Sequence, residues 1–156
     1  NGGPVVGLDA LYEHKGILLG LTGEVGAIIF NGEQVYTGLL LGQSKDFGLV
    51  ATSVFAEVGF HGVHGFVSGM FDHSTHGSDW AILPYAGARL NADLTILKEV
   101  DLTLGIWSAL RMDLMQREQD IEVNAGLFRN ENDTEFRTYR VGGLQAAAGL
   151  QLGMTF

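Results

Sequence analysis

The sequence predicts an all-β fold: an antiparallel up-and-down sheet that closes into a transmembrane β-barrel. Three observations indicate this fold. Apolar side chains recur at every second position, the residues between them are small or polar, and no apolar run reaches the roughly 18 residues of a membrane-spanning helix. The 156 residues suffice for a single domain, which we expect to comprise residues 1–156.

The alternation is clearest in the C-terminal segment, residues 144–156. Its even-numbered positions are all apolar, whereas its odd-numbered positions hold Gly, Gln, Ala and Thr. Segments 100–114 and 80–96 repeat the pattern. An amphipathic helix would instead place apolar residues at i, i+3, i+4 and i+7. These segments are therefore expected to be strands with one broad apolar face.

The composition of the polar face indicates which way each face points. A soluble barrel directs its apolar face inward and covers its outer face with charged and hydroxyl side chains. Here the polar face is rich in small residues, and glycine alone contributes 23 residues to the chain. Small side chains fill a narrow barrel interior, while the apolar face meets lipid. A soluble barrel is the alternative to this interpretation.

Eight strands are expected. Because the 24 residues of 48–71 far exceed the roughly 9–11 needed to cross a bilayer, a turn between Gly59 and Gly65 is expected to divide them. Short links at Asn31-Gly32 and Lys98-Glu99 are assigned to one side of the membrane, and longer links at 42–47, 72–79 and 116–137 to the other. The expected strands are 4–13, 16–30, 34–43, 48–58, 61–71, 79–97, 100–117 and 138–156.

Charged residues of inward parity are expected to form a network in the interior, because an unpaired buried charge costs several kcal/mol. This network is interpreted as a structural plug. The alternative is a narrow pore, which would favour cations because acids outnumber bases. The inward set is Asp9, Glu24, Glu57, Arg89, Asp93, Arg111 and Asp113.

Aromatic residues near the expected strand ends are predicted to form girdles at the two membrane surfaces. Phe30, Tyr36 and Phe156 are assigned to one girdle. Tyr12, Phe47, Phe71, Trp80 and Tyr139 are assigned to the other.

The last residues resemble a known family signature. Phe156 is preceded by apolar Met154, Leu152 and Leu150 at alternate positions. This pattern is similar to the C-terminal insertion signal of bacterial outer-membrane β-barrel proteins. The resemblance implies an integral outer-membrane location, contact with outer-membrane lipid and with the barrel-insertion machinery, and a signal peptide already removed. For such a barrel we expect a non-enzymatic scaffold that acts through its loops or through another envelope protein.

Histidine is concentrated in one stretch, with His61, His64, His73 and His76 among the five in the chain. If 61–71 is a strand, about 3.3 Å per residue separates the two pairs by roughly 30 Å, so all four cannot bind one ion. Imidazole and carboxylate ligands suit zinc, copper or nickel, which makes His73 and His76 candidate metal ligands beside Asp72 or Asp79. Solvated loop histidines are the alternative, and no cofactor is expected.

The same stretch permits an enzymatic interpretation. His76-Gly77-Ser78-Asp79 is similar to the His-x-Ser-Asn stretch of outer-membrane phospholipases and lipid A deacylases, with Asp79 in place of Asn. The resemblance implies a lipid-ester hydrolase in which Ser78 is the nucleophile and His76 the base. A serine nucleophile needs an adjacent, oriented base, and Asp79, Asp72 or His73 could orient His76.

Charge and cysteine content exclude other classes. The formal net charge of -9 opposes binding to nucleic acid through bulk electrostatics. The chain has no cysteine, which excludes disulfides, thiolate metal sites and a thiol nucleophile.

Overall fold

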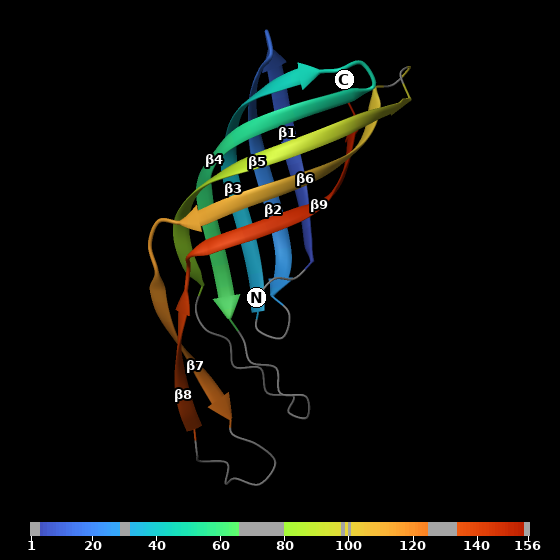
Figure 1. Ribbon diagram of the computed structural model, residues 1–156. Helices are drawn as coiled ribbons and strands as arrows, with labels where there is room; N and C mark the ends of the chain where they lie inside the picture. Colours follow the sequence, from blue (N-terminus) through green and yellow to red (C-terminus); the bar gives the residue numbers. More distant parts are fainter. Residues whose placement is uncertain are drawn as a thin grey trace.

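The computed structural model describes residues 4–28, 32–65, 80–97, 99, 101–124 and 134–154, and its regular elements are antiparallel β-strands. Seven strands form one sheet in the order β1-β2-β3-β4-β5-β6-β9, curled into a half-barrel (Figure 1). No helix in these residues is both long enough and apolar enough to cross a membrane. The seven strands are β1 (Val5–His14), β2 (Ile17–Ile28), β3 (Gly32–Asp46), β4 (Val50–Gly65), β5 (Ala81–Leu97), β6 (Leu102–Asp113) and β9 (Leu144–Met154).

The prediction of an all-β, antiparallel, up-and-down fold is confirmed, and local sequence explains the tightest connection. The β1–β2 register runs to His14 opposite Ile17, which leaves only Lys15 and Gly16 in the turn. Both residues have positive φ angles, 53° and 77°. A two-residue type I′ turn requires positive φ at both positions, and it matches the twist of the strands that it joins.

Alternation along each strand sorts the side chains onto two faces. On the concave face, charged and polar side chains such as Glu57, Arg111 and Asp113 are buried. On the convex face, large apolar side chains are exposed, including Leu8 at 80% and Leu150 at 78%. The polarity of the two faces is therefore opposite to that of a water-soluble barrel, whose apolar side chains are buried inside.

The expected division of residues 48–71 is wrong. β4 continues from Val50 to Gly65, paired with β3 along its whole length and with β5 along most of it. Gly59, which the sequence placed at a turn, lies in mid-strand opposite Gly38. A Cβ at Gly59 would collide with the carbonyl oxygen of Thr37. This glycine is therefore explained by close packing inside the sheet and not by a turn.

Because β4 is one strand and not two, the connections are distributed between the two ends of the sheet differently from the prediction. In the observed order, the connections at 15–16, 47–49 and 98–101 lie at one end, and those at 29–31, 66–79 and 114–143 at the other. The expected grouping of 42–47 with 72–79 and 116–137 is therefore wrong. Residues 116–137, expected as a loop, include β7 (Arg117–Asn124), which pairs with β8 (Thr134–Val141) in a hairpin that projects beyond the sheet (Figure 1).

Glycines on the concave face make space for large side chains from other strands of the sheet. A Cβ at Gly38 would lie 2.6 Å from the Tyr85 hydroxyl and 2.8 Å from the carbonyl oxygen of Val58. A Cβ at Gly87 would lie 3.0 Å from Cγ of Arg111. The interior therefore needs small residues at these positions, because protein interiors are close-packed.

Replacing Gly38 by alanine should destabilise the fold by about 1–3 kcal/mol, because the new methyl group overlaps both the Tyr85 hydroxyl and backbone. Gly23→Ala is the matched control, since a Cβ there meets no atom within 4 Å. The free energy of unfolding in detergent micelles, measured by denaturant titration, checks the difference. Equal stability of the two variants would contradict the packing described for Gly38.

Candidate functional site

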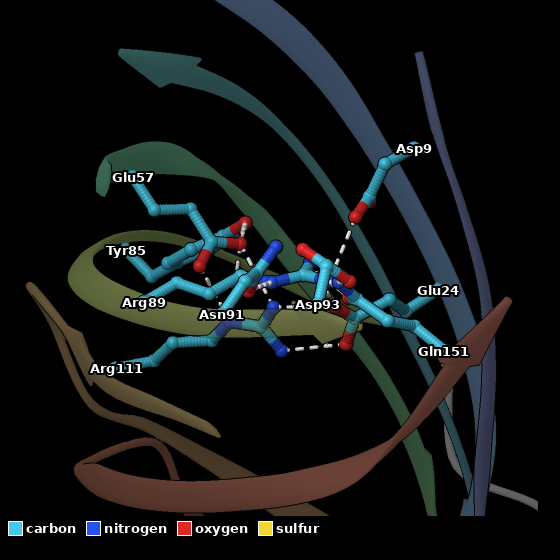
Figure 2. A network of polar contacts seen from close by, with 9 residues as sticks. All are labelled: Asp9, Glu24, Glu57, Tyr85, Arg89, Asn91, Asp93, Arg111 and Gln151. Carbon is cyan, nitrogen blue, oxygen red and sulfur yellow. Dashed lines mark hydrogen bonds and ion pairs between the residues drawn. The ribbon is translucent and has the colours of Figure 1, made fainter. Parts of the chain in front are cut away.

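The most highly organised polar feature is the central network, a set of nine side chains on the concave face (Figure 2). Its centre is Arg111 on β6. The Arg111 guanidinium donates two hydrogen bonds of 2.6 Å to the carboxylate of Glu24 on β2, and its Nε donates to Glu57 on β4 at 3.1 Å. The hydroxyl of Tyr85 donates to Glu57 at 2.7 Å. The nine are Asp9, Glu24, Glu57, Tyr85, Arg89, Asn91, Asp93, Arg111 and Gln151.

The second cation of the central network, Arg89 on β5, extends it toward both edges of the sheet. Its Nη2 lies 2.7 Å from Asp9 on β1 and donates to Gln151 on β9 at 3.4 Å. Nη1 lies 3.6 Å from Glu24, the carboxylate that Arg111 also contacts. Nε donates to the Asn91 side chain at 3.0 Å. Arg89 therefore joins the first strand of the sheet to the last through side chains.

Tyr36 on β3 connects this network to a further polar group. Cζ of the Arg111 guanidinium lies 4.6 Å from the centroid of the Tyr36 ring. The same ring stacks on the His61 ring, with the two centroids 4.2 Å apart. The Tyr36 side chain is buried, so its assignment to a membrane-surface girdle is wrong. Residues at alternate positions share one face of a strand, so Tyr36 lies on the same face as Gln34 and Gly38. A polar and a small residue on that face were the signal that could have placed Tyr36 inside.

The His61 cluster comprises His61, Asp113 and Gln145. Nδ1 of His61 lies 3.1 Å from Oδ1 of Asp113, and Gln145 donates to Oδ2 of Asp113 at 2.7 Å. A carboxylate only accepts hydrogen bonds, so a hydrogen bond from His61 to Asp113 requires the Nδ1–H tautomer; the amide nitrogen of Gln145 also lies 3.1 Å from Nδ1. Nε2 of His61 is buried and has no hydrogen-bond partner among the described residues. Neither the burial of His61 nor its pairing with Asp113 was predicted from the sequence.

The charges in these two groups are unequal. Four carboxylates in the central network and Asp113 in the His61 cluster face only two guanidiniums, those of Arg89 and Arg111. Each arginine therefore serves more than one acid. Since Glu24, Glu57, Arg89 and Arg111 are all buried, these contacts act at low dielectric, where they fix side chains and strands firmly.

The structure brings together only some of the sequence-predicted site residues. Glu24, Arg89, Asp93 and Arg111 belong to the central network, whereas Asp113 belongs to the His61 cluster. Of the proposed insertion signal, Leu150, Leu152 and Met154 are exposed on the convex face of β9. Four candidate residues and the last residue of the signal lie outside the described residues: His73, His76, Ser78, Asp79 and Phe156.

Metal binding has no support in the part of the chain that the structure describes, where no three His, Asp or Glu side chains are grouped closely enough to hold an ion. His64, the neighbour of His61 on β4, stacks on Trp80 with ring centroids 5.3 Å apart. The two histidines lie on opposite faces of the strand, because side chains three residues apart in a strand point in opposite directions.

Comparisons with known proteins found no match for this chain. No protein-family model, no curated protein and no solved structure matches the chain.

Replacing Arg111 by methionine should destabilise the protein by about 3–5 kcal/mol, because it leaves the Glu24 and Glu57 carboxylates buried without their main cation. Arg140→Met is the control, because the Arg140–Glu118 pair is exposed and such pairs contribute little. Denaturant titration in detergent measures both. Restored stability in the triple variant Glu24→Gln, Glu57→Gln, Arg111→Met would show that the unpaired acids cause the loss.

Proposed function

We propose that the chain is an integral outer-membrane β-barrel that acts as a non-enzymatic scaffold, through its loops or by binding another envelope protein. The observation that supports this most strongly is the inverted polarity of the sheet. Exposed leucines, valines and isoleucines cover the convex face, while ionised groups are buried on the concave face. An exposed apolar surface of this extent needs lipid or protein against it, because soluble monomers rarely carry large apolar patches.

We also propose that the working form is a closed barrel of eight strands. The seven-stranded sheet is already curled into a half-barrel. In lipid, closure pairs the backbone groups that an open sheet edge would leave without partners. Single-chain bacterial barrels have even strand numbers, and a barrel of eight has an interior just wide enough for side chains to fill.

The contents of the interior favour a scaffold over a pore. Arg111 contacts acids from β2 and β4, and Arg89 reaches acids or amides on β1 and β9, so side chains cross the space that an aqueous channel would occupy. The alternative narrow pore would prefer cations, because acids outnumber bases in the interior. A scaffold of this kind presents its connecting segments to partners and uses the barrel to hold them in the membrane.

Placing an arginine at Leu90 tests the membrane assignment. Leu90 is 58% exposed near the middle of β5. In a bilayer, Leu90→Arg should cost about 2–4 kcal/mol, because a charge on the lipid face near the midplane loses its hydration. Gln116→Arg, in an exposed link, is the control and should change little. The measurement is the folding free energy in phosphatidylcholine vesicles, and equal tolerance of both arginines would contradict a lipid-facing convex surface.

The alternative of a lipid-ester hydrolase at Ser78 and His76 is tested by turnover. As a scaffold, the purified protein should release no fatty acid from phospholipid or lipid A in mixed micelles, with or without calcium. Ser78→Ala should then be indistinguishable from the wild type. Turnover that Ser78→Ala abolishes without loss of folded protein would establish the hydrolase and overturn the non-enzymatic proposal, because the serine hydroxyl would be the attacking group.

A further inference from the structure

The two edges of the sheet, β1 and β9, run in the same direction. Seven strands alternate in direction through six antiparallel pairings, so the first and the seventh are parallel to each other. Direct closure would therefore create one parallel pairing in a sheet whose other pairings are all antiparallel. One additional strand between the edges could pair antiparallel with both.

The space between the edges is limited to a small width. Asp9 on β1 and Gln151 on β9 both contact Nη2 of the same Arg89 side chain, so the edges approach each other across the interior. The described residues of β1 and β9 nevertheless form no ladder. Neighbouring strands lie about 4.8 Å apart, so one inserted strand needs the edges about 10 Å apart. The Asp9 and Gln151 side chains can extend over such a gap to a shared partner.

Charge indicates which residue an inserted strand would direct inward. Two of the five carboxylates contact neither guanidinium within the described residues: Asp113 contacts His61 and Gln145, whereas the partner of Asp93 is the amide of Gln151. Asp93, Gly105 and Gln151 are register partners across β5, β6 and β9. Gly105 has no side chain between them, so the two polar groups meet. A strand added at the open edge of β9 would place its own residue next to Gln151 in this register.

We propose that the gap between β1 and β9 binds one extended polypeptide strand, antiparallel to both, which directs a basic side chain toward Asp93 and Gln151. The strand belongs to a partner polypeptide, and its outward side chains are apolar. Backbone hydrogen bonds to the two edges would provide affinity, as in other cases of strand addition, and the basic side chain would provide specificity. This inference depends on the proposed membrane function, because the outward side chains must meet lipid.

A second copy of the chain fits the gap less well. If the two-fold axis followed the barrel axis, β1 would pair with the other copy's β9 in parallel. If the axis were perpendicular, the pairings would be antiparallel but the two copies would lie in the membrane in opposite orientations. Either dimer would also widen the interior. A wider interior would not keep Asp9 on β1 and Gln151 on β9 in contact with the same Arg89 side chain.

The test uses the 156-residue chain in detergent micelles and two labelled synthetic peptides of about ten residues, the length that crosses a bilayer. Both peptides alternate leucine with glycine or threonine, and they differ only in one central inward residue, arginine or aspartate. The arginine peptide should bind at least about tenfold more tightly, a ratio equivalent to roughly 1.4 kcal/mol. The variant Asp93→Asn should remove most of this preference while it still binds the peptide backbone.

Engineered cysteines locate the peptide, because the chain has none of its own. In Leu8→Cys/Leu150→Cys, the two edges should form no disulfide when the arginine peptide is bound, since a disulfide needs Cα atoms within about 7 Å. A bismaleimide that spans about 10 Å should link them, as expected for strands separated by two interstrand spacings. Leu104→Cys/Leu152→Cys joins register partners on β6 and β9, so its disulfide reports that the sheet has folded.

The possible results separate the partners. Absence of peptide binding to a folded sheet, or equal binding of the two peptides, would overturn the proposal. A disulfide between positions 8 and 150 within one chain would indicate direct closure, and a disulfide-linked dimer would indicate a second copy. Either result overturns the inserted strand while leaving the membrane proposal standing. Failure of the protein to enter lipid vesicles would instead overturn the proposed function.

Discussion

Arg111 illustrates the constraint on which the rest of the sheet depends: each buried carboxylate must find a cation or a hydrogen-bond donor, and cations are few. Its guanidinium has enough donors in a planar arrangement to contact Glu24 on both oxygens and Glu57 through Nε at the same time. A lysine ammonium could not hold two carboxylates in this geometry. Because the three residues lie on β6, β2 and β4, this interaction also fixes the curl that brings those strands together.

The size of side chains on the concave face follows from this network. Arginine and tyrosine are long, and a narrow interior accepts two of them where another strand provides glycine. Tyr85 lies over Gly38, and Arg111 lies over Gly87. Polar interactions and close packing therefore select the same pattern of large and small residues. The high glycine content of the chain is, in part, a consequence of its internal charges.

The convex face has the opposite requirement. Its leucines and valines make few contacts within the chain, so their contribution to stability depends on what surrounds them. Lipid would satisfy that requirement without any specific partner. The open edges of β1 and β9 carry backbone groups that another strand could pair with. In the proposed function, the sheet would supply location and stability, and recognition would belong to the connecting segments and to the edges. In the buried His61–Asp113 pair, Nε2 of His61 has no hydrogen-bond partner within the described residues.

Local sequence was sufficient to assign the class of the sheet and the side of many of its residues. Strict alternation is a local property, so the apolar face of β9 and the inward parity of Glu24, Arg89 and Arg111 could be assigned from their neighbours in the chain. Only the tertiary structure decided the register, and with it which acid meets which arginine. Gly59 had the local signal of a turn but lies in mid-strand, because its backbone packs closely against Thr37 and Gly38 of β3. Tyr36 looked like a surface aromatic and is buried between Arg111 and His61. Such contacts join residues far apart in the sequence, and periodicity within one strand carries no information about them.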